Sequence, residues 1–148
     1  MNYVMRLLTI LKKTTKKYNL PHSNVFARLG RSDIHGVGVF AIIDIPKGTY
    51  VFEGDKSEVI WFTEKEITLS ALPQPIQKLY KDFCVILPDG NSKKYGCPDS
   101  FNNMPISWYL NESKNPNLSC DKDYDFYTLR DIKAGEELTV DYSTYSIA

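Results

Sequence analysis

The stretch Asn111-Glu112-Ser113-Lys114-Asn115-Pro116-Asn117 decides the fold when it is combined with Glu137-Leu138-Thr139-Val140-Asp141-Tyr142 further along the chain. Alone, the first stretch is a polar turn, because Asn and Ser side chains readily hydrogen-bond to the backbone beside them. The second alternates in the manner of a strand, with Tyr142 on the apolar side. A third block, His35-Gly36-Val37-Gly38-Val39-Phe40-Ala41, precedes both. The order and spacing of the three blocks carry more information than any one of them.

Length and composition indicate one soluble domain. The 148 residues are 43% hydrophobic and 24% charged, which is ordinary for a globular protein with a real core. Eighteen basic residues balance 18 acidic ones, so no overall field favours direct binding of nucleic acid. We expect a single compact domain.

The charges are unevenly distributed. Residues 1–20 hold five basic residues and no acid, so the rest of the chain carries 13 basic and 18 acidic residues, a formal charge of −5. Apolar residues at helical spacing (Val4, Leu7, Leu8, Leu11) predict an amphipathic helix over 3–17. We therefore divide the chain into a basic helix, 1–21, and a main domain, 22–148. The helix could pack on the domain or serve as a binding arm.

The cysteines and the apolar runs indicate an intracellular protein. Cys84, Cys97 and Cys120 are odd in number and form no Cys-x-x-Cys pair, which argues against a disulfide scaffold and against a cysteine zinc site. The run 7–11 is too short for a secretory signal, and no run approaches the roughly 20 apolar residues of a membrane span. We expect no metal, no membrane and a cytoplasmic location.

From Val25 onward the pattern predicts short strands broken by turns. Thr63-Glu64-Lys65-Glu66 matches a capping box and predicts a short helix that ends by Pro73. The fold class is therefore mostly β with short helices. The expected strands are Val25–Leu29, Val37–Ile43, Thr49–Phe52, Val59–Phe62, Cys84–Leu87, Asp125–Leu129 and Glu137–Tyr142.

A faint internal repeat is also present. Phe40-x-x-x-Asp44-Ile45-Pro46-Lys47-Gly48 is matched in outline by Tyr127-x-x-x-Asp131-Ile132-Lys133-Ala134-Gly135. Each unit should form a hairpin with the strand that follows it, and the two hairpins could pair about a pseudo-twofold axis. Chance use of common turn residues explains the match equally well.

The glycine block fits two interpretations. Gly36 and Gly38 let the backbone approach a ligand closely, with amides free to hold a carboxylate or phosphate. A dinucleotide-binding loop would continue into a helix, whereas Val39–Ile43 has the pattern of a strand. The alternative is a bulge or a tight entry into that strand.

Together, the three blocks resemble the signature motifs of the SET-domain protein-lysine methyltransferases, over about residues 24–145. The chain is most similar to the short, stand-alone bacterial and viral members without a cysteine-rich zinc segment after the domain. The resemblance implies a β-clip type fold of small sheets around a knot-like C-terminal segment. For a viral or secreted member it also implies a possible location in a host nucleus.

The resemblance implies that S-adenosylmethionine (SAM) is the cofactor. It places cofactor contacts on the backbone of His35, Gly36, Val37 and Gly38, and on Leu110, Asn111, Glu112 and Tyr142. Glu112 departs from the pattern, since the family usually has His there. If backbone groups make that contact, Glu112 can replace His; if the imidazole is required, cofactor binding is impaired.

The resemblance also implies that Tyr142 is catalytic, at the junction between the SAM methyl and the lysine nitrogen. The expected lysine channel comprises Tyr145, Tyr109, Phe101 and Val140. Val140 stands where many relatives have Phe or Tyr, so the number of methyl groups transferred stays open.

Three functions follow from these observations. The first is methyl transfer to lysine in a basic protein such as a histone or a histone-like protein, which the acidic main domain favours. The second is an impaired SET-fold module that binds a protein partner, and the third is an unrelated β-rich binding domain. Without a closing C-terminal segment, a homodimer is reasonable.

Overall fold

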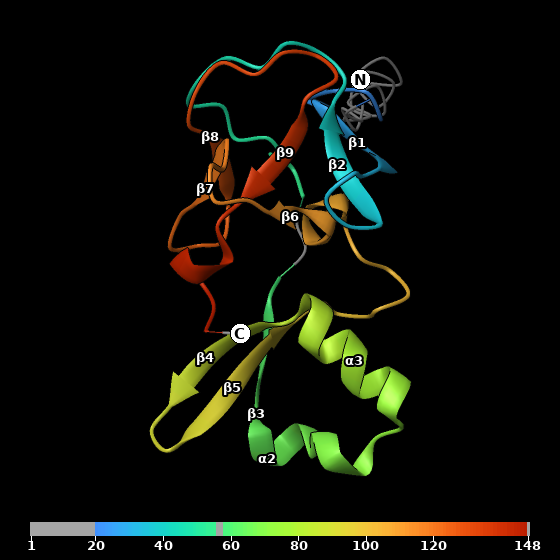
Figure 1. Ribbon diagram of the computed structural model, residues 1–148, viewed down its shortest axis with the longest axis vertical. Coiled ribbons are helices and arrows are strands. Elements are labelled where there is room, and N and C mark those ends of the chain that lie inside the picture. The colour runs from blue at the N-terminus through green and yellow to red at the C-terminus, as the bar shows by residue number, and fades with distance from the viewer. Residues whose placement is uncertain (1–19, 56–57, 148) are drawn as a thin grey trace, which may run out of the picture.

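The computed structural model describes residues 20–55 and 58–147, and its elements form two groups (Figure 1). The predicted helix over 3–17 lies outside the described residues. One group contains a four-stranded sheet and a two-stranded sheet, and the other contains a three-stranded sheet with two α-helices. The mostly β fold predicted from the sequence is confirmed.

The four-stranded sheet contains part of each of the three sequence blocks. Its order is β1-β2-β9-β6, with β1 (Ala27–Arg31), β2 (Val37–Ala41) and β9 (Glu137–Val140) antiparallel. The two-residue strand β6 (Asn111–Glu112) runs parallel to β9. Val39 pairs with Leu138, and both side chains are fully buried. The sheet therefore brings the glycine block, the Asn111 block and the Tyr142 block together.

The internal repeat is a structural pair. Ile45 and Ile132 exchange backbone hydrogen bonds of 2.9 and 2.8 Å, and both are 1% exposed. The Asp44 carboxylate accepts a bond from the amide of Ala134, while the Asp131 carboxylate accepts one from the amide of Lys47. Each aspartate thus caps the turn of the other repeat.

The predicted pairing within each repeat is wrong. Each unit pairs with the strand that follows the other unit: β2 pairs with β9, while residues 49–51 bond to β8 (Phe126–Thr128). The predicted strand Thr49–Phe52 reduces to one bridge, Tyr50 to Tyr127, because the chain turns at residues 51–54. β8 instead pairs fully with β7 (Leu118–Cys120), a strand absent from the prediction.

The second group begins with β3 (Ile60–Thr63). The capping box is present: the Thr63 hydroxyl accepts from the Glu66 amide, and the Glu66 carboxylate accepts from the Thr63 amide. It opens α2 (Glu64–Ile67). The other elements are the 3-10 turn η1 (Leu69–Ala71), α3 (Gln74–Phe83), β4 (Val85–Asp89) and β5 (Ser92–Cys97), with sheet order β3-β5-β4.

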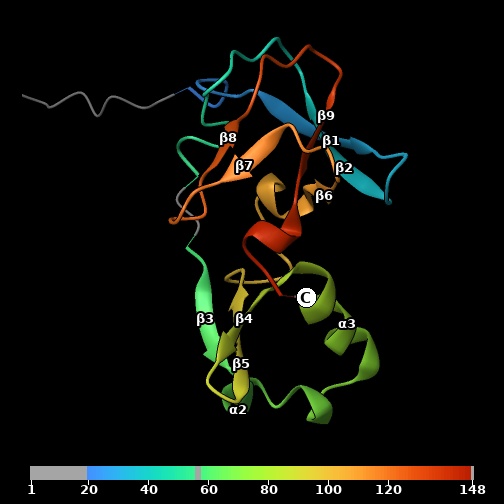
Figure 2. The ribbon, with the colours of Figure 1, turned by 60° about the vertical axis from the view of Figure 1, so that its left-hand side comes forward.

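Two junctions connect the groups. The 3-10 turn η2 (Ile106–Tyr109) leads back into β6. After β9, the 3-10 turn η3 (Tyr142–Thr144) directs the chain toward β4, where the amide of Ile147 donates to the carbonyl of Ile86. Figure 2 shows the C-terminus against the second group. None of the described helices is long and apolar enough to cross a bilayer.

The paired isoleucines give a test of the strand exchange. We expect Ile132→Ala to lower the free energy of unfolding by about 2–5 kcal/mol, because it opens a cavity where the two repeats meet. The control is Ile43→Ala, since Ile43 is 47% exposed and should cost about 0.5 kcal/mol or less. Urea unfolding measures both. Equal losses would show that the repeat contact does not support the fold.

Candidate active site

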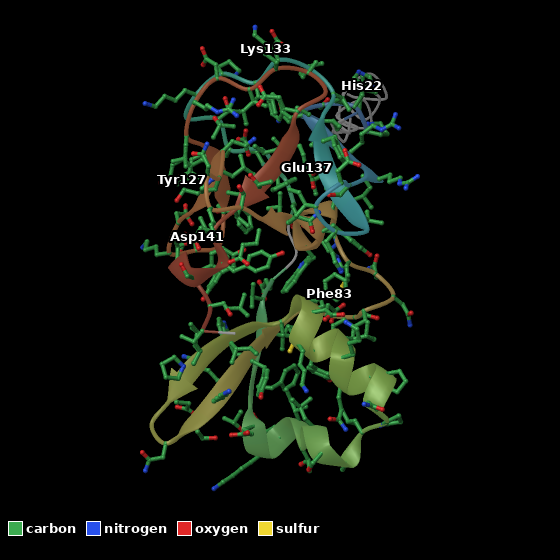
Figure 3. All side chains as sticks on the ribbon, in the orientation of Figure 1. His22, Phe83, Tyr127, Lys133, Glu137 and Asp141 are labelled. Atoms are coloured by element: carbon green, nitrogen blue, oxygen red, sulfur yellow. The ribbon has the colours of Figure 1, made fainter. Side chains whose placement is uncertain are left out.

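A cavity of about 530 Å³ lies where the two groups of elements meet. Its walls come from the segment before β3, the end of α3, η2, the β7–β8 turn and η3. Phe83 stands at the end of α3 that faces the other group (Figure 3). The aromatic lining residues are Phe52, Trp61, Phe83, Trp108, Tyr124, Phe126, Tyr142 and Tyr145.

Tyr142 is held firmly at the cavity wall. Its hydroxyl donates a 2.6 Å hydrogen bond to the carbonyl of Leu110, and Leu110 also lines the cavity. Burial raises the pKa of Tyr142, and the charge of Glu112 raises it further, so the hydroxyl stays protonated. The predicted strand through Tyr142 is wrong, because β9 ends at Val140 and Tyr142 opens η3. That turn directs the ring into the cavity wall.

Tyr145 belongs to the same wall. Its ring packs edge-on against those of Tyr142, Phe126 and Tyr124, with centroids 6.2, 6.0 and 6.5 Å away. Burial raises the pKa of Tyr145. These rings form an apolar wall beside the Tyr142 hydroxyl.

The other three predicted channel residues are not in the cavity lining. Phe101 packs edge-on against Tyr80, and Tyr109 packs edge-on against Phe83. Val140 is 1% exposed in the core beneath the sheet. Phe101 and Tyr109 therefore support the cavity wall at Phe83, and Val140 supports the strand that leads to Tyr142.

Asn111 is the centre of a buried polar cluster. Its Nδ2 has four oxygen neighbours within 3.2 Å: the carbonyls of His35 and Val37, the Ser32 hydroxyl, and Oε1 of Glu137. Four acceptors fix the amide orientation, with nitrogen toward the cluster. Oδ1 has no hydrogen-bond partner among the described residues, and no buried side-chain oxygen is left unpaired, so Oδ1 faces accessible space.

Ser32 and Glu137 complete this cluster, and Ser32 was not among the residues predicted for the site. The Ser32 hydroxyl donates to Glu137 and accepts from the amides of Ile34 and His35. Glu137 begins β9 beside β2 (Figure 3). The cluster therefore holds the loop that contains His35, Gly36 and Val37 against the start of β9.

Gly38 is required by the same cluster. A Cβ at this position would collide with the Glu137 carboxylate and lie 3.1 Å from Nδ2 of Asn111. Gly36 has a φ of +47° and open space around it, so it is needed for its backbone conformation. The backbone at Gly38 therefore closely approaches the side chains of Glu137 and Asn111, which are buried polar groups of the protein itself.

Glu112 and Asn117 occupy opposite environments. The Glu112 side chain is exposed, while its backbone is paired with Val140 in the parallel ladder. Asn117 is 4% exposed, donates to the carbonyl of Glu137 and accepts from the amide of Thr139. Asn117 thus fixes β9 from the side opposite β2, a role that the motif alone did not reveal.

Carboxylates outnumber amines around the cavity. Five acidic and two basic residues line it. Partial burial raises the pKa of Asp125, and the nearby carboxylates of Asp121, Asp123 and Asp55 raise it further. The β7–β8 turn therefore concentrates negative charge beside the aromatic wall. The charged lining residues are Asp55, Glu58, Asp82, Asp123, Asp125, Lys81 and Lys122.

The predicted cofactor residues and the cavity meet at one boundary. Leu110 and Tyr142 line the cavity, whereas His35, Gly36, Val37, Gly38, Asn111 and Glu112 do not. Within residues 20–55 and 58–147, no group of three or more His, Cys, Asp or Glu residues is positioned to hold a metal ion. The arrangement is a polar loop site and an apolar cavity, joined where the Tyr142 hydroxyl meets the Leu110 carbonyl.

Gly38→Ala tests the cluster. We expect the variant to have a free energy of unfolding about 1–3 kcal/mol lower than that of the wild type, because the new methyl group must displace the Glu137 carboxylate. Val37→Ala is the control, since Val37 is 46% exposed. Denaturant titration checks both, and an unaffected Gly38→Ala protein would contradict the tight packing at this position.

Comparisons with known proteins identify a family and a similar fold. No curated protein sequence matches the chain. One similar solved structure is described as a humanized mutant of the Chaetomium thermophilum Polycomb Repressive Complex 2 bound to the inhibitor GSK126. It aligns with a TM-score of 0.56 at 21% identity, over 84% of this chain and 16% of that one, so the similarity concerns the fold. The family model described as the SET domain matches residues 36–143. The chain therefore belongs to the SET-domain family, whose characteristic activity is protein-lysine methylation.

Proposed function

We propose that this protein transfers the methyl group of SAM to a lysine side-chain amine of a protein substrate. The observation that carries the proposal is the Tyr142 hydroxyl, fixed on the Leu110 carbonyl between an aromatic cavity and the Asn111 cluster. The cavity and the Asn111 cluster could each bind one reactant, and the two reactants would meet at the Tyr142–Leu110 hydrogen bond.

The residues of the loop side fit SAM. Oδ1 of Asn111 is an accessible acceptor whose orientation is fixed by the hydrogen bonds of Nδ2. The carbonyls of His35 and Val37 accept from that Nδ2 and lie beside it. Such acceptors suit the ammonium of an amino-acid moiety. The backbone of Glu112, with the side chain pointing away, would hold the other end. When bound, SAM supplies an electrophilic methyl group and a neutral thioether as leaving group.

The cavity side suits the lysine. A free lysine with a pKa near ~10.4 is only about 0.04% neutral at pH 7. An aromatic wall lowers the pKa of an amine by desolvation, and a nearby sulfonium charge lowers it further. Because the Tyr142 hydroxyl donates its hydrogen bond to the Leu110 carbonyl, its oxygen is left to accept a hydrogen bond from the lysine nitrogen. Tyr142 and the Leu110 carbonyl would orient the nitrogen lone pair, and the amine proton leaves through the open cavity.

The substrate we propose is a basic segment of a protein, such as that of a histone or a histone-like protein. Carboxylates of the β7–β8 turn and of α3 rim the cavity, so cationic residues flanking the target lysine would relieve the repulsion that raises the pKa of Asp125. A cytoplasmic location and a homodimer, both expected from the sequence, belong to this proposal.

A partner-binding module without turnover is the second candidate, and Glu112 favours it because the family usually has His there. The exposed side chain of Glu112 argues that the backbone can still serve the cofactor. SAM binding by calorimetry, together with a methylation assay on a lysine peptide, distinguishes the two. Binding without transfer would support the module.

Tyr142→Phe is the sharpest test of the proposed reaction. We expect the SAM dissociation constant to stay within about twofold and kcat to fall about 100-fold, because the variant loses an oriented oxygen at the reacting nitrogen. Tyr127→Phe is the matched control, since Tyr127 lies outside the cavity lining. Calorimetry measures the SAM dissociation constant, and transfer of a labelled methyl group to the peptide measures kcat. An undiminished kcat would remove Tyr142 from the mechanism.

The acidic rim gives a test of substrate class. We expect the double variant Asp123→Asn, Asp125→Asn to raise KM for an arginine-flanked lysine peptide roughly three- to tenfold, with kcat and thermal stability retained. The variant should also lose much of the salt dependence of KM. Asp89→Asn makes a carboxylate-to-amide change in the β4–β5 hairpin, outside the cavity lining, and serves as control. Equal KM values in all three proteins would refute recognition by the rim.

A further inference from the structure

We propose that Cys84 and Cys97 form a redox-active dithiol that a disulfide oxidant closes into an intramolecular disulfide at the wall of the cavity. Their Sγ atoms lie 3.1 Å apart, and the side chains are 5% and 3% exposed. Both are free thiols in the structure. The sequence pattern argued against a disulfide scaffold, but it did not predict this proximity.

The sheet register places the two residues for a bond. Val85 pairs with Gly96 in the β4–β5 ladder, so Cys84 and Cys97 are the next facing positions. Facing antiparallel residues have Cα atoms about 4.5–5.5 Å apart, within the range of disulfides. Closing the Sγ atoms to about 2.05 Å requires a movement of about 1 Å. This is small enough for side-chain rotation and a slight backbone shift.

The position also provides access. Cys84 lines the cavity directly after Phe83, although little of its surface is exposed. A disulfide oxidant in the cavity can therefore approach Cys84 without unfolding of the β4–β5 sheet. Cys120 offers an internal contrast: among the described residues its Sγ hydrogen-bonds to the carbonyl of Asp121 and to no other thiol.

The chemistry is a two-step thiol–disulfide exchange. One thiolate of the pair attacks the oxidant R–S–S–R, forming a mixed disulfide and releasing one R–S⁻. The second thiolate attacks the bound sulfur, forms the Cys84–Cys97 bond and releases the second R–S⁻. The two thiol protons end on the released thiolates. The protein loses two electrons, and the oxidant is reduced to two thiols.

The bond would fix the end of α3 to β5. Cys84 caps α3 through its amide, which donates to the carbonyl of Tyr80, and the α3 end supplies Asp82 and Phe83 to the cavity. A wall moved by about 1 Å should fit a peptide less well. The Asn111 cluster lies in the other group of elements, so the SAM site should not change. This consequence for activity rests on the proposed function; the bond itself does not.

The first experiment treats the folded protein with glutathione disulfide, blocks the remaining thiols and maps the peptides by mass spectrometry. We expect loss of two hydrogens and a Cys84–Cys97 linkage in the wild type and in Cys120→Ser, but not in Cys84→Ser or Cys97→Ser. Dithiothreitol should reverse it. Full alkylation of Cys84 and Cys97 after treatment, or a linkage through Cys120, would overturn the proposal even if both serine variants fail to fold.

A second experiment separates this proposal from the proposed function. In the oxidised wild type we expect kcat/KM for a lysine peptide to fall roughly two- to tenfold at an unchanged SAM dissociation constant. Cys120→Ser should behave identically. Absence of all methyl transfer by the reduced protein counts against the proposed function only. A mapped disulfide with unchanged kcat/KM overturns the link between the dithiol and the cavity.

Discussion

The structure depends on the side-chain amide of Asn111. This one group contacts the loop after β1, through Ser32 and the carbonyls of His35 and Val37, and the start of β9, through Glu137. Segments that are more than 70 residues apart in the chain meet at a single buried nitrogen. Removing it would take a donor away from four oxygens, although the Ser32 hydroxyl and Oε1 of Glu137 would still bond to each other. A buried polar group that loses its partner costs more than a formed bond contributes. The cluster therefore specifies one arrangement of the loop.

A second constraint lies beneath the first. The reciprocal bonds between Ile45 and Ile132, each flanked by an aspartate that caps the opposite turn, fix where β9 begins relative to β2. Because Leu138, Thr139 and Val140 are all buried, a shift in the register of β9 would move Glu137 or Asp141 into the core. The position of Tyr142 two residues later follows from that register, and the turn η3 supplies its direction.

The pattern of apolar residues predicted the mostly β fold class but not every element, and the motifs indicated residues that the structure brings close together. Asn111, Gly38 and Tyr142 were selected because they match motifs of the SET-domain family, and their roles in the reaction stay predictions. Helix α3 was missed, although Ile76, Leu79, Tyr80 and Phe83 follow helical spacing and its proline, Pro75, lies in the first turn, where proline is compatible with a helix. Strand β5 was missed because Lys93 and Lys94 dilute its apolar pattern.

Other residues could not have been selected from the sequence. Ser32 also bonds to the nearby amides of Ile34 and His35, but its place in the cluster comes from Asn111 and Glu137, which are 79 and 105 residues away. Likewise, Val140 occupies a motif position, yet tertiary packing directs it into the core instead of the cavity. Local chemistry predicts a motif's backbone path, while the side that each residue faces is decided by contacts distant in sequence.

The same reasoning explains why position 112 can differ from the family pattern. Successive residues of a strand point to opposite faces, so in β6 the burial of Asn111 requires that the side chain at 112 faces outward. The buried cluster is therefore indifferent to which side chain stands there. What the neighbouring backbone contributes is set by the parallel pairing with Val140 and by the Ser113 amide, which donates to the carbonyl of Val140. The substitution changes the charge beside Tyr142, where it raises the pKa of the hydroxyl, and leaves the geometry that holds Tyr142 intact.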